Sequence, residues 1–191
     1  MKCILCESYT FTHICSTCKT TFLSPALYKR TLANGVDILS FYKYEEIKEL
    51  LFTKHTELGF YIYTILAKLS FKKFAKEFHT KEKFVSIAVD DTSADGYSHT
   101  AILNNHLKTY NIQPLFNKLR ATNQISYSGQ TKLFREQNPR NFLLKKFTSD
   151  TVILVDDIVT TGQTLTQACE KMKEQGKTVS FCLTLTDVSL K

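Results

Sequence analysis

The sequence contains no apolar run that approaches the ~20 residues of a membrane-spanning helix, which argues against an integral membrane protein. The first residues, Met1 to Glu7, lack the apolar core of a secretory signal peptide. Neither the Walker pattern GxxxxGKS/T nor the Rossmann pattern GxGxxG occurs, which argues against the nucleotide-binding folds that those patterns mark. We therefore expect a cytoplasmic protein, whose cysteines stay reduced.

With 191 residues, 43% of them hydrophobic, the chain can bury one main core and carry a small additional module. The formal net charge is +7, and it is concentrated, because residues 105–150 hold eight Lys and Arg against two acids. Residues 86–104 hold three acids, Asp90, Asp91 and Asp95, and no Lys or Arg. A concentrated basic segment suggests a polyanionic partner.

Four of the six cysteines form two CxxC pairs near the N-terminus, Cys3 with Cys6 and Cys15 with Cys18. Each pair can place two thiolates on one side of a tight turn, and two pairs complete a tetrahedral Zn²⁺ site. A segment this short has too little apolar surface to fold alone. Metal binding would therefore supply its folding energy. We predict a structural zinc ion, since four protein ligands leave no open position. Free or disulfide-linked cysteines are the alternative, and His13 could substitute for one ligand.

The apolar pattern predicts an α/β chain with a parallel sheet flanked by helices. The expected strands are 36–44, 84–89, 113–119, 151–155 and 178–186. The expected helices are 45–78, interrupted near His55 or Gly59, 100–110 and 163–175. Gly176 stands where a C-terminal cap belongs, after a helix whose apolar face consists of Leu165, Ala168, Cys169 and Met172. We assign residues 1–33 to a zinc-binding module and residues 34–191 to the α/β domain.

The strongest indication of function is the run from Val152 to Thr164. A short buried strand ends in two acids, and a turn rich in hydroxyl groups then leads into an amphipathic helix. Carboxylates can accept hydrogen bonds from ribose hydroxyls, and a helix N-terminus attracts a phosphate. Gly162 permits a close approach of the backbone. The predicted sugar-phosphate site consists of Asp156, Asp157, Thr160, Thr161, Gly162, Gln163 and Thr164. The alternative is an acid that caps a helix beside an ordinary Thr-Gly turn.

The basic segment also contains aromatic residues, and cations for phosphates with rings for base stacking are what single-stranded DNA binding needs. The predicted DNA-binding residues are Lys118, Arg120, Lys132, Arg135, Arg140, Lys145 and Lys146. The alternative, that these residues form a solvated basic face beside core aromatics, stays open at this point.

The run from Val152 to Thr164 resembles the phosphoribosyl pyrophosphate (PRPP) signature of type I phosphoribosyltransferases. Together with the two CxxC pairs, the chain resembles the ComF family of natural-competence proteins, of the ComFC type. Leu50 to Lys54 followed by Gly59 also resembles that family, as do the spaced residues Arg120, Gln130, Leu133, Asn141 and Phe147. The resemblance implies a type I phosphoribosyltransferase-like domain after a zinc module. It also implies that Asp156 and Asp157 hold the ribose hydroxyls of PRPP, and that Thr160 to Thr164 hold its 5′-phosphate.

In two places the chain departs from that family. The family usually shows a Pro-Val-Pro-like strand end and a basic RGFNQ-like run, where this chain has Ala88 to Asp91 and Asp95 to His99. A transferase must stabilise the departing pyrophosphate, which normally takes cations or Mg²⁺. Acids without basic neighbours would repel it unless a metal bridges them, which favours binding over turnover.

The first hypothesis is a competence protein required for natural transformation, which handles incoming single-stranded DNA and binds PRPP or a related sugar phosphate. By the resemblance, its partners include a competence helicase or the inner-membrane DNA-uptake machinery. Its expected location is then the cytoplasm or the inner face of the cytoplasmic membrane. The alternative is a catalytic phosphoribosyltransferase that joins PRPP, bound with Mg²⁺, to an unidentified base or amine. A third hypothesis is a zinc-dependent adaptor with a vestigial loop.

Overall fold

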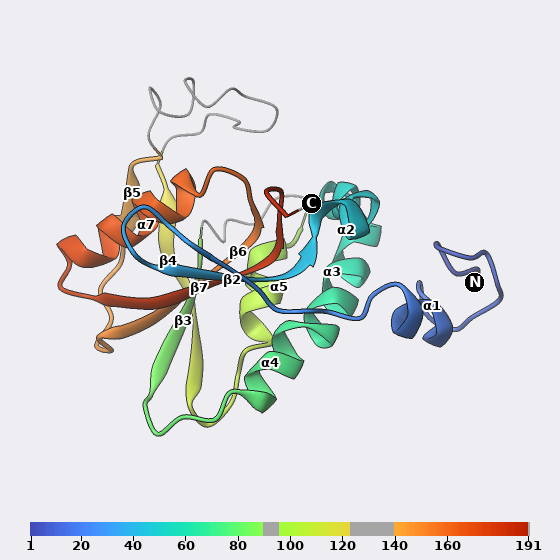
Figure 1. The fold of residues 1–191 in the computed structure, drawn as a ribbon, viewed down its shortest axis with the longest axis horizontal. Helices are drawn as coiled ribbons and strands as arrows, with labels where there is room; N and C mark the ends of the chain where they lie inside the picture. The colour runs from blue at the N-terminus through green and yellow to red at the C-terminus, as the bar shows by residue number, and fades with distance from the viewer. Residues whose placement is uncertain (90–95, 123–139, 191) are drawn as a thin grey trace.

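The structure of the chain is a computed structural model that describes residues 1–89, 96–122 and 140–190. The strands of these residues are β1 (Tyr28–Thr31), β2 (Asp37–Lys43), β3 (Phe84–Val89), β4 (Ile112–Ala121), β5 (Phe142–Leu144), β6 (Thr151–Val159) and β7 (Thr178–Asp187). They form one sheet in the order β1-β2-β7-β6-β3-β4-β5 (Figure 1). Neighbouring strands from β2 to β4 run parallel, while β1 and β5 pair antiparallel at the two edges.

The sequence explains why β3 and β6 lie inside the sheet. Every residue of β3 is buried, and Val152 to Val155 of β6 have no exposed surface. Continuous apolar runs of this kind are typical of parallel strands that are covered on both faces. The predicted α/β class with a parallel sheet flanked by helices is confirmed.

Helices cover both faces of the sheet (Figure 1). One face carries α2 (Tyr44–Leu51), the 3-10 turn η1 (Phe52–His55), α3 (Glu57–Leu69), α4 (Phe71–Glu77) and α5 (His99–Asn105), and the other carries α7 (Gln163–Glu174). Ile153 and Val155 of β6 pack in the core under the first group, and Val152 and Leu154 pack in the core under α7. Successive side chains of β6 therefore point to opposite faces.

The long helical segment predicted for residues 45–78 is confirmed, and its interruption falls at Thr56. The Thr56 hydroxyl caps α3 by accepting a hydrogen bond from the N–H of Gly59 at 3.4 Å. The helix predicted for 100–110 is too long, because α5 ends at Asn105. Thr109 Oγ1 accepts a hydrogen bond from the N–H of Ile112 at 3.1 Å, in the turn that leads into β4.

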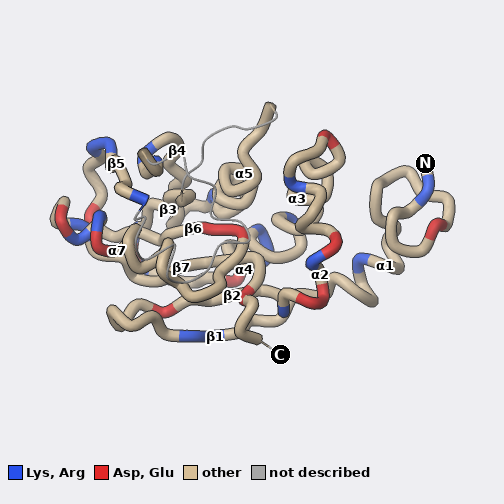
Figure 2. The backbone as a smooth tube through the Cα atoms, turned by 90° about the horizontal axis from the view of Figure 1, so that it is seen from above, with Lys and Arg blue, Asp and Glu red and all other residues tan. Residues whose placement is uncertain are grey.

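The strand predicted to end at residue 155 continues to Val159. Its residues from Asp156 onward pair with Thr184 to Asp187 of β7. The two acids therefore lie inside β6, where successive side chains alternate, and not in the loop that follows it. In Figure 2 the acidic stretch of β6 lies between α7 and α5.

The end of the chain agrees with the prediction. All four residues of the predicted apolar face of α7 are buried. Gly176 has a φ of +69°, a left-handed conformation that favours glycine. The N–H groups of Gly176 and Lys177 donate to the carbonyls of Lys173 and Met172, both at 3.0 Å, which ends the helix.

The N-terminal segment forms a small unit beside α3 (Figure 1) and contains α1 (Ser16–Thr21). Ile14 is buried against the main core, and the ring of His13 stacks on Tyr61 with a centroid distance of 4.4 Å. Within the predicted module range of 1–33, β1 pairs with β2 of the large sheet. The domain boundary after residue 33 stays a prediction. None of the helices in the described parts of the chain is both long and apolar enough to cross a bilayer.

Candidate functional site

The loop between β6 and α7 turns sharply at Gly162. This residue is the N-cap of α7, and its φ of +83° lies in the left-handed region that favours glycine. A Cβ at this position would lie 2.4 Å from Cδ2 of Leu32, which follows β1. The backbone conformation therefore favours glycine, and any larger residue here would also force the Leu32 side chain to move. The close approach predicted for Gly162 concerned a bound phosphate and stays a prediction, while the group nearest to this glycine in the structure is the Leu32 side chain.

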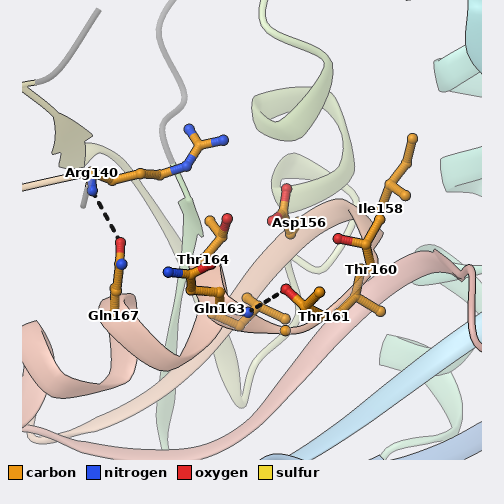
Figure 3. A pocket seen from close by; sticks show the side chains of 11 residues that line it. Arg140, Asp156, Ile158, Thr160, Thr161, Gln163, Thr164 and Gln167 are labelled. Carbon is orange, nitrogen blue, oxygen red and sulfur yellow. Dashed lines mark hydrogen bonds between the residues drawn. The ribbon is translucent and has the colours of Figure 1, made fainter. Parts of the chain in front are cut away.

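A pocket opens at the N-terminus of α7 (Figure 3). Its lining includes Thr160 to Thr164, Asp156 and Arg140. In the first turn of an α-helix the N–H groups have no carbonyl partner within the helix, and the helix dipole adds a partial positive charge. The pocket therefore offers what a phosphate group needs.

Two more side chains make the pocket suitable for a polar ligand. The backbone N–H of Arg140 donates to Oε1 of Gln167 at 3.1 Å, and the Arg140 guanidinium extends over the pocket toward Asp156 (Figure 3). Oε1 of Gln163 is buried and has no hydrogen-bond partner within the described residues. Because unpartnered buried polar groups are costly, the Gln163 amide favours a ligand that can hydrogen-bond to it.

Asp156 and Asp157 serve opposite faces of the sheet. Asp156 lines the pocket on the α7 side, and its Oδ1 accepts the N–H of Asp157 at 2.9 Å. Asp157 is buried on the face that carries α3 and α5. The structure thus brings Asp156 together with Thr160 to Thr164, and it places the Asp157 side chain behind the strand.

Three side chains from distant segments surround Oδ2 of Asp157. The Tyr63 hydroxyl donates to it at 3.3 Å, and Lys54 Nζ and His99 Nε2 lie 3.5 and 3.4 Å away. Oδ1 accepts the N–H of Ile158 at 2.8 Å. Sequence reasoning assigned no role to these three side chains, because their contacts depend on how α3 and α5 are placed against β6.

The segment around Lys54 was part of the family resemblance, and Gly59 has a structural reason there. A Cβ on Gly59 would lie 2.2 Å from both the Thr53 carbonyl oxygen and the Tyr97 hydroxyl. The Tyr97 hydroxyl donates to the carbonyls of Lys54 and Thr56. Gly59 therefore lets η1 pack closely against α3. This packing places Lys54 of η1 beside Asp157.

The two neighbouring carboxyl groups have opposite pKa shifts. Burial raises the pKa of Asp156 well above its usual range, the charge of Asp157 adds to this effect, and Arg140 opposes it. Burial also acts to raise the pKa of Asp157, but the charges of His99 and Lys54 outweigh it and lower that pKa. Asp157 is therefore the ionised partner of Lys54 and of a protonated His99, while burial disfavours the ionised form of Asp156.

The predicted DNA-binding residues do not all lie together. Arg120 is exposed on β4, and Lys145 and Lys146 are exposed directly after β5. Lys118 Nζ donates to the carbonyl of Lys146 at 2.8 Å, so it also lies at this edge. Arg140 lines the pocket instead. Lys132 and Arg135 lie outside the described residues, as do the acids at 90, 91 and 95, and the DNA surface stays a prediction.

The four N-terminal cysteines form one cluster, in which all Sγ atoms lie within 4.8 Å of one another. The Sγ atoms of Cys6 and Cys15 are 3.7 Å apart. Tetrahedral zinc with Zn–S bonds of about 2.3 Å separates its sulfur ligands by roughly 3.8 Å. The N–H of Cys15 donates to Cys3 Sγ at 3.3 Å, and the N–H of Cys18 donates to Cys15 Sγ at 3.4 Å. The four thiols could thus hold a metal such as zinc.

Residues 115–189 match the family model of the phosphoribosyl transferase domain, a match that covers less than half of the chain. The matched segment contains β6, the loop at Gly162 and α7. The C-terminal part of the chain is therefore similar to a phosphoribosyltransferase domain, and the fold is phosphoribosyltransferase-like. No curated protein matches the sequence.

Three solved structures to which the chain is similar are phosphoribosyltransferases. Hypoxanthine phosphoribosyltransferase from Staphylococcus aureus is 16% identical, with a TM-score of 0.40 over 65% of this chain and 62% of that chain. The chain thus spans less than two thirds of that enzyme. Adenine phosphoribosyl transferase from Trypanosoma brucei, in complex with AMP, pyrophosphate and ribose-5-phosphate, is 15% identical, with a TM-score of 0.42 over 88% and 78%. Orotate phosphoribosyltransferase from Aeropyrum pernix is 17% identical, with a TM-score of 0.40 over 90% and 80%. Identities and TM-scores this low say nothing about the function of this chain.

The opposite pKa shifts predict opposite effects of removing each charge. The raised pKa of Asp156 means that its ionised form destabilises the fold at pH 7, and the lowered pKa of Asp157 means that its ionised form stabilises it. We expect Asp156→Asn to raise the Tm of the ligand-free protein and Asp157→Asn to lower it. Each Tm should shift by about 2–4 °C for every kcal/mol of change in the free energy of unfolding. The difference in Tm between wild type and Asp157→Asn disappears as the pH falls through the lowered pKa of Asp157.

Thermal unfolding between pH 3 and pH 7 measures both effects. Asp150→Asn is the matched control, because Asp150 is exposed and pairs with Lys177 at 3.0 Å on the surface. A fall in Tm for both Asp156→Asn and Asp157→Asn at pH 7 would contradict the claim that ionised Asp156 destabilises the fold while ionised Asp157 stabilises it.

Proposed function

We propose that this chain binds PRPP or a closely related sugar phosphate in the pocket at the N-terminus of α7. The observation that carries the proposal is the convergence of three features on this pocket. They are the helix N-terminus after the left-handed Gly162, the hydroxyl groups of Thr160 to Thr164, and the Asp156 carboxylate. The match of residues 115–189 to a phosphoribosyl transferase domain supports the same ligand class.

In this proposal the parts of the ligand follow the chemistry of the pocket. The 5′-phosphate binds to the N–H groups and hydroxyls of Thr160 to Thr164, and Asp156 accepts hydrogen bonds from the ribose hydroxyls. The cost of burying ionised Asp156 is offset when ribose hydroxyls or a cation approach it. Asp156 would also be available to hold a Mg²⁺ ion that accompanies PRPP, and such an ion would offset the pyrophosphate charge.

A second candidate function, catalytic phosphoribosyl transfer, is favoured by the cations on the other face of β6. Lys54 and His99 are each partly exposed, at 28% and 26% of the side chain, although both contact Asp157 and neither lines the pocket. The departing pyrophosphate needs such cations. In a transfer reaction the acceptor nitrogen would form a bond to C1 of the ribose as the bond from C1 to the pyrophosphate oxygen breaks. Release of pyrophosphate from PRPP with candidate bases distinguishes this function from binding alone.

We further propose that the cysteine cluster binds zinc and that the role of the chain is in natural transformation, in the cytoplasm or at its membrane face. The wider role rests on the resemblance to the ComF family. The close approach of the four thiols supports the zinc module that the resemblance implies. The exposed cations beside β4 and β5 are suited to contact with single-stranded DNA, and a competence helicase or the uptake machinery would be the protein partner.

Gly162→Ala tests the phosphate site. We expect the affinity for PRPP, measured by calorimetry with Mg²⁺ present, to fall about tenfold, because a Cβ 2.4 Å from Leu32 Cδ2 requires the loop or the Leu32 side chain to shift. Gly35→Ala is the matched control, since Gly35 has the same φ of +83° but no atom within 4 Å of its Cβ position. It should lose about 1 kcal/mol of stability and keep its affinity. Equal affinities of wild type and Gly162→Ala contradict the site.

Metal content tests the zinc cluster. We expect about one zinc ion per purified chain, since four thiolates make one tetrahedral site. Cys18→Ser should lose the metal and lower the Tm, because zinc binding contributes folding energy. Cys169→Ser is the control, as Cys169 is also buried but lies on α7. Elemental analysis that finds no zinc in the wild-type protein overturns the assignment.

Transformation frequency tests the wider role. We expect a strain without this chain to lose natural transformation and to regain it with the wild-type chain or Asp150→Asn. Asp156→Asn and Cys18→Ser should restore it poorly, because they remove the proposed ribose contact and a zinc ligand. Normal transformation in the deletion strain rules out the competence role, whatever the pocket binds.

A further inference from the structure

We propose that Arg30 is a positioning residue of the phosphate loop, which it holds in shape by joining the Thr160 carbonyl to the buried carboxylate of Asp187. This inference rests on the proposed function of the pocket, because it names what fixes that pocket. Arg30 is not among the residues that line the pocket. It acts through the loop backbone and not through contact with the ligand.

Arg30 contacts two partners at once. Its Nε lies 2.7 Å from Oδ2 of Asp187, in an ion pair without a hydrogen bond from Nε, and its Nη2 donates to the carbonyl oxygen of Thr160 at 3.0 Å. A guanidinium group is planar and rigid. The ion pair with Asp187 therefore keeps the guanidinium group at the loop, where Nη2 reaches the Thr160 carbonyl.

Asp187 is itself rigidly held. It is the last residue of β7, it is only 1% exposed, and its Oδ1 accepts the N–H and the hydroxyl of Ser189, both at 2.8 Å. The N–H of Val188 donates to the carbonyl of Val159 at 2.9 Å, which ties this end of β7 to the end of β6. A buried carboxylate needs a cationic partner, and Arg30 supplies it.

β1 contacts the loop at a second point. Leu32, two residues after Arg30, packs against Gly162, and Arg30 Nη2 lies 4.0 Å from the position of a Cβ on that glycine. Arg30 and Leu32 thus hold the loop at Thr160 and at Gly162. Because the peptide bond is trans and planar, the N–H of Thr161 points away from the guanidinium that binds the Thr160 carbonyl. Arg30 thereby fixes the direction of an N–H group in the loop.

Arg30→Lys separates this role from a structural one. Lysine keeps the charge beside Asp187, but its single ammonium group on a flexible stem cannot reproduce the two-pronged contact. We expect Arg30→Lys to keep its Tm within about 2 °C of wild type, while its affinity for ribose 5-phosphate falls about tenfold. Hydrogen exchange of residues 158–164 should become faster in this variant, with and without ligand.

Lys29→Ala is the matched control, because Lys29 lies next to Arg30 and pairs with Asp37 at 2.8 Å on the exposed side of the same hairpin. It should leave affinity and exchange unchanged. Wild-type affinity or wild-type exchange in Arg30→Lys overturns the proposal, as does a loss of Tm in proportion to the loss of affinity. If wild type binds no sugar phosphate, the proposed function fails, and the exchange of residues 158–164 still decides whether Arg30 holds the loop.

Discussion

The alternation of side chains along β6 separates two carboxylates that are neighbours in sequence, and the arrangement of the candidate site depends on this separation. Adjacent ionised acids on one face would repel each other in a buried site. On opposite faces each acid has its own environment. Lys54, His99 and Tyr63 surround Asp157 behind the strand, and Asp156 faces the pocket with Arg140. Asp157 thus joins the helices to the sheet, and Asp156 faces the pocket in which a ligand is proposed to bind.

The loop that follows β6 depends on parts of the chain that lie far from it. Gly162 turns the backbone into α7, and the β1 segment holds the loop in place. Preorganisation of this kind matters for anion binding, because loop N–H groups that already point at the anion need no ordering when it binds. The N-terminal cysteine cluster, which could hold a metal, precedes β1 in the chain and lies beside α3.

The sequence made the local features of the site predictable. The helix after Gly162, its apolar face and the clustering of the four cysteines follow from short-range patterns, and the structure contains all three. The supporting contacts were not predictable, because they join residues far apart in sequence. Tyr63 and Asp157 are 94 positions apart, and Arg30 and Thr160 are 130 apart. Such contacts depend on strand order and on helix placement, which no local pattern contains. The sequence did not predict that Asp156 and Asp157 point to opposite faces of the sheet, because β6 was predicted to end before them.

In the proposed function, the loop from Thr160 to Thr164 binds the phosphate of a sugar phosphate through its backbone. An NMR titration of the ¹⁵N-labelled protein with ribose 5-phosphate tests it most directly. An amide proton that donates a hydrogen bond to a phosphate shifts downfield. We expect saturable downfield shifts of the Gly162, Gln163 and Thr164 amides, with the signals of β3 and α4 unchanged. Saturable shifts elsewhere, with these three amides unmoved, would contradict it.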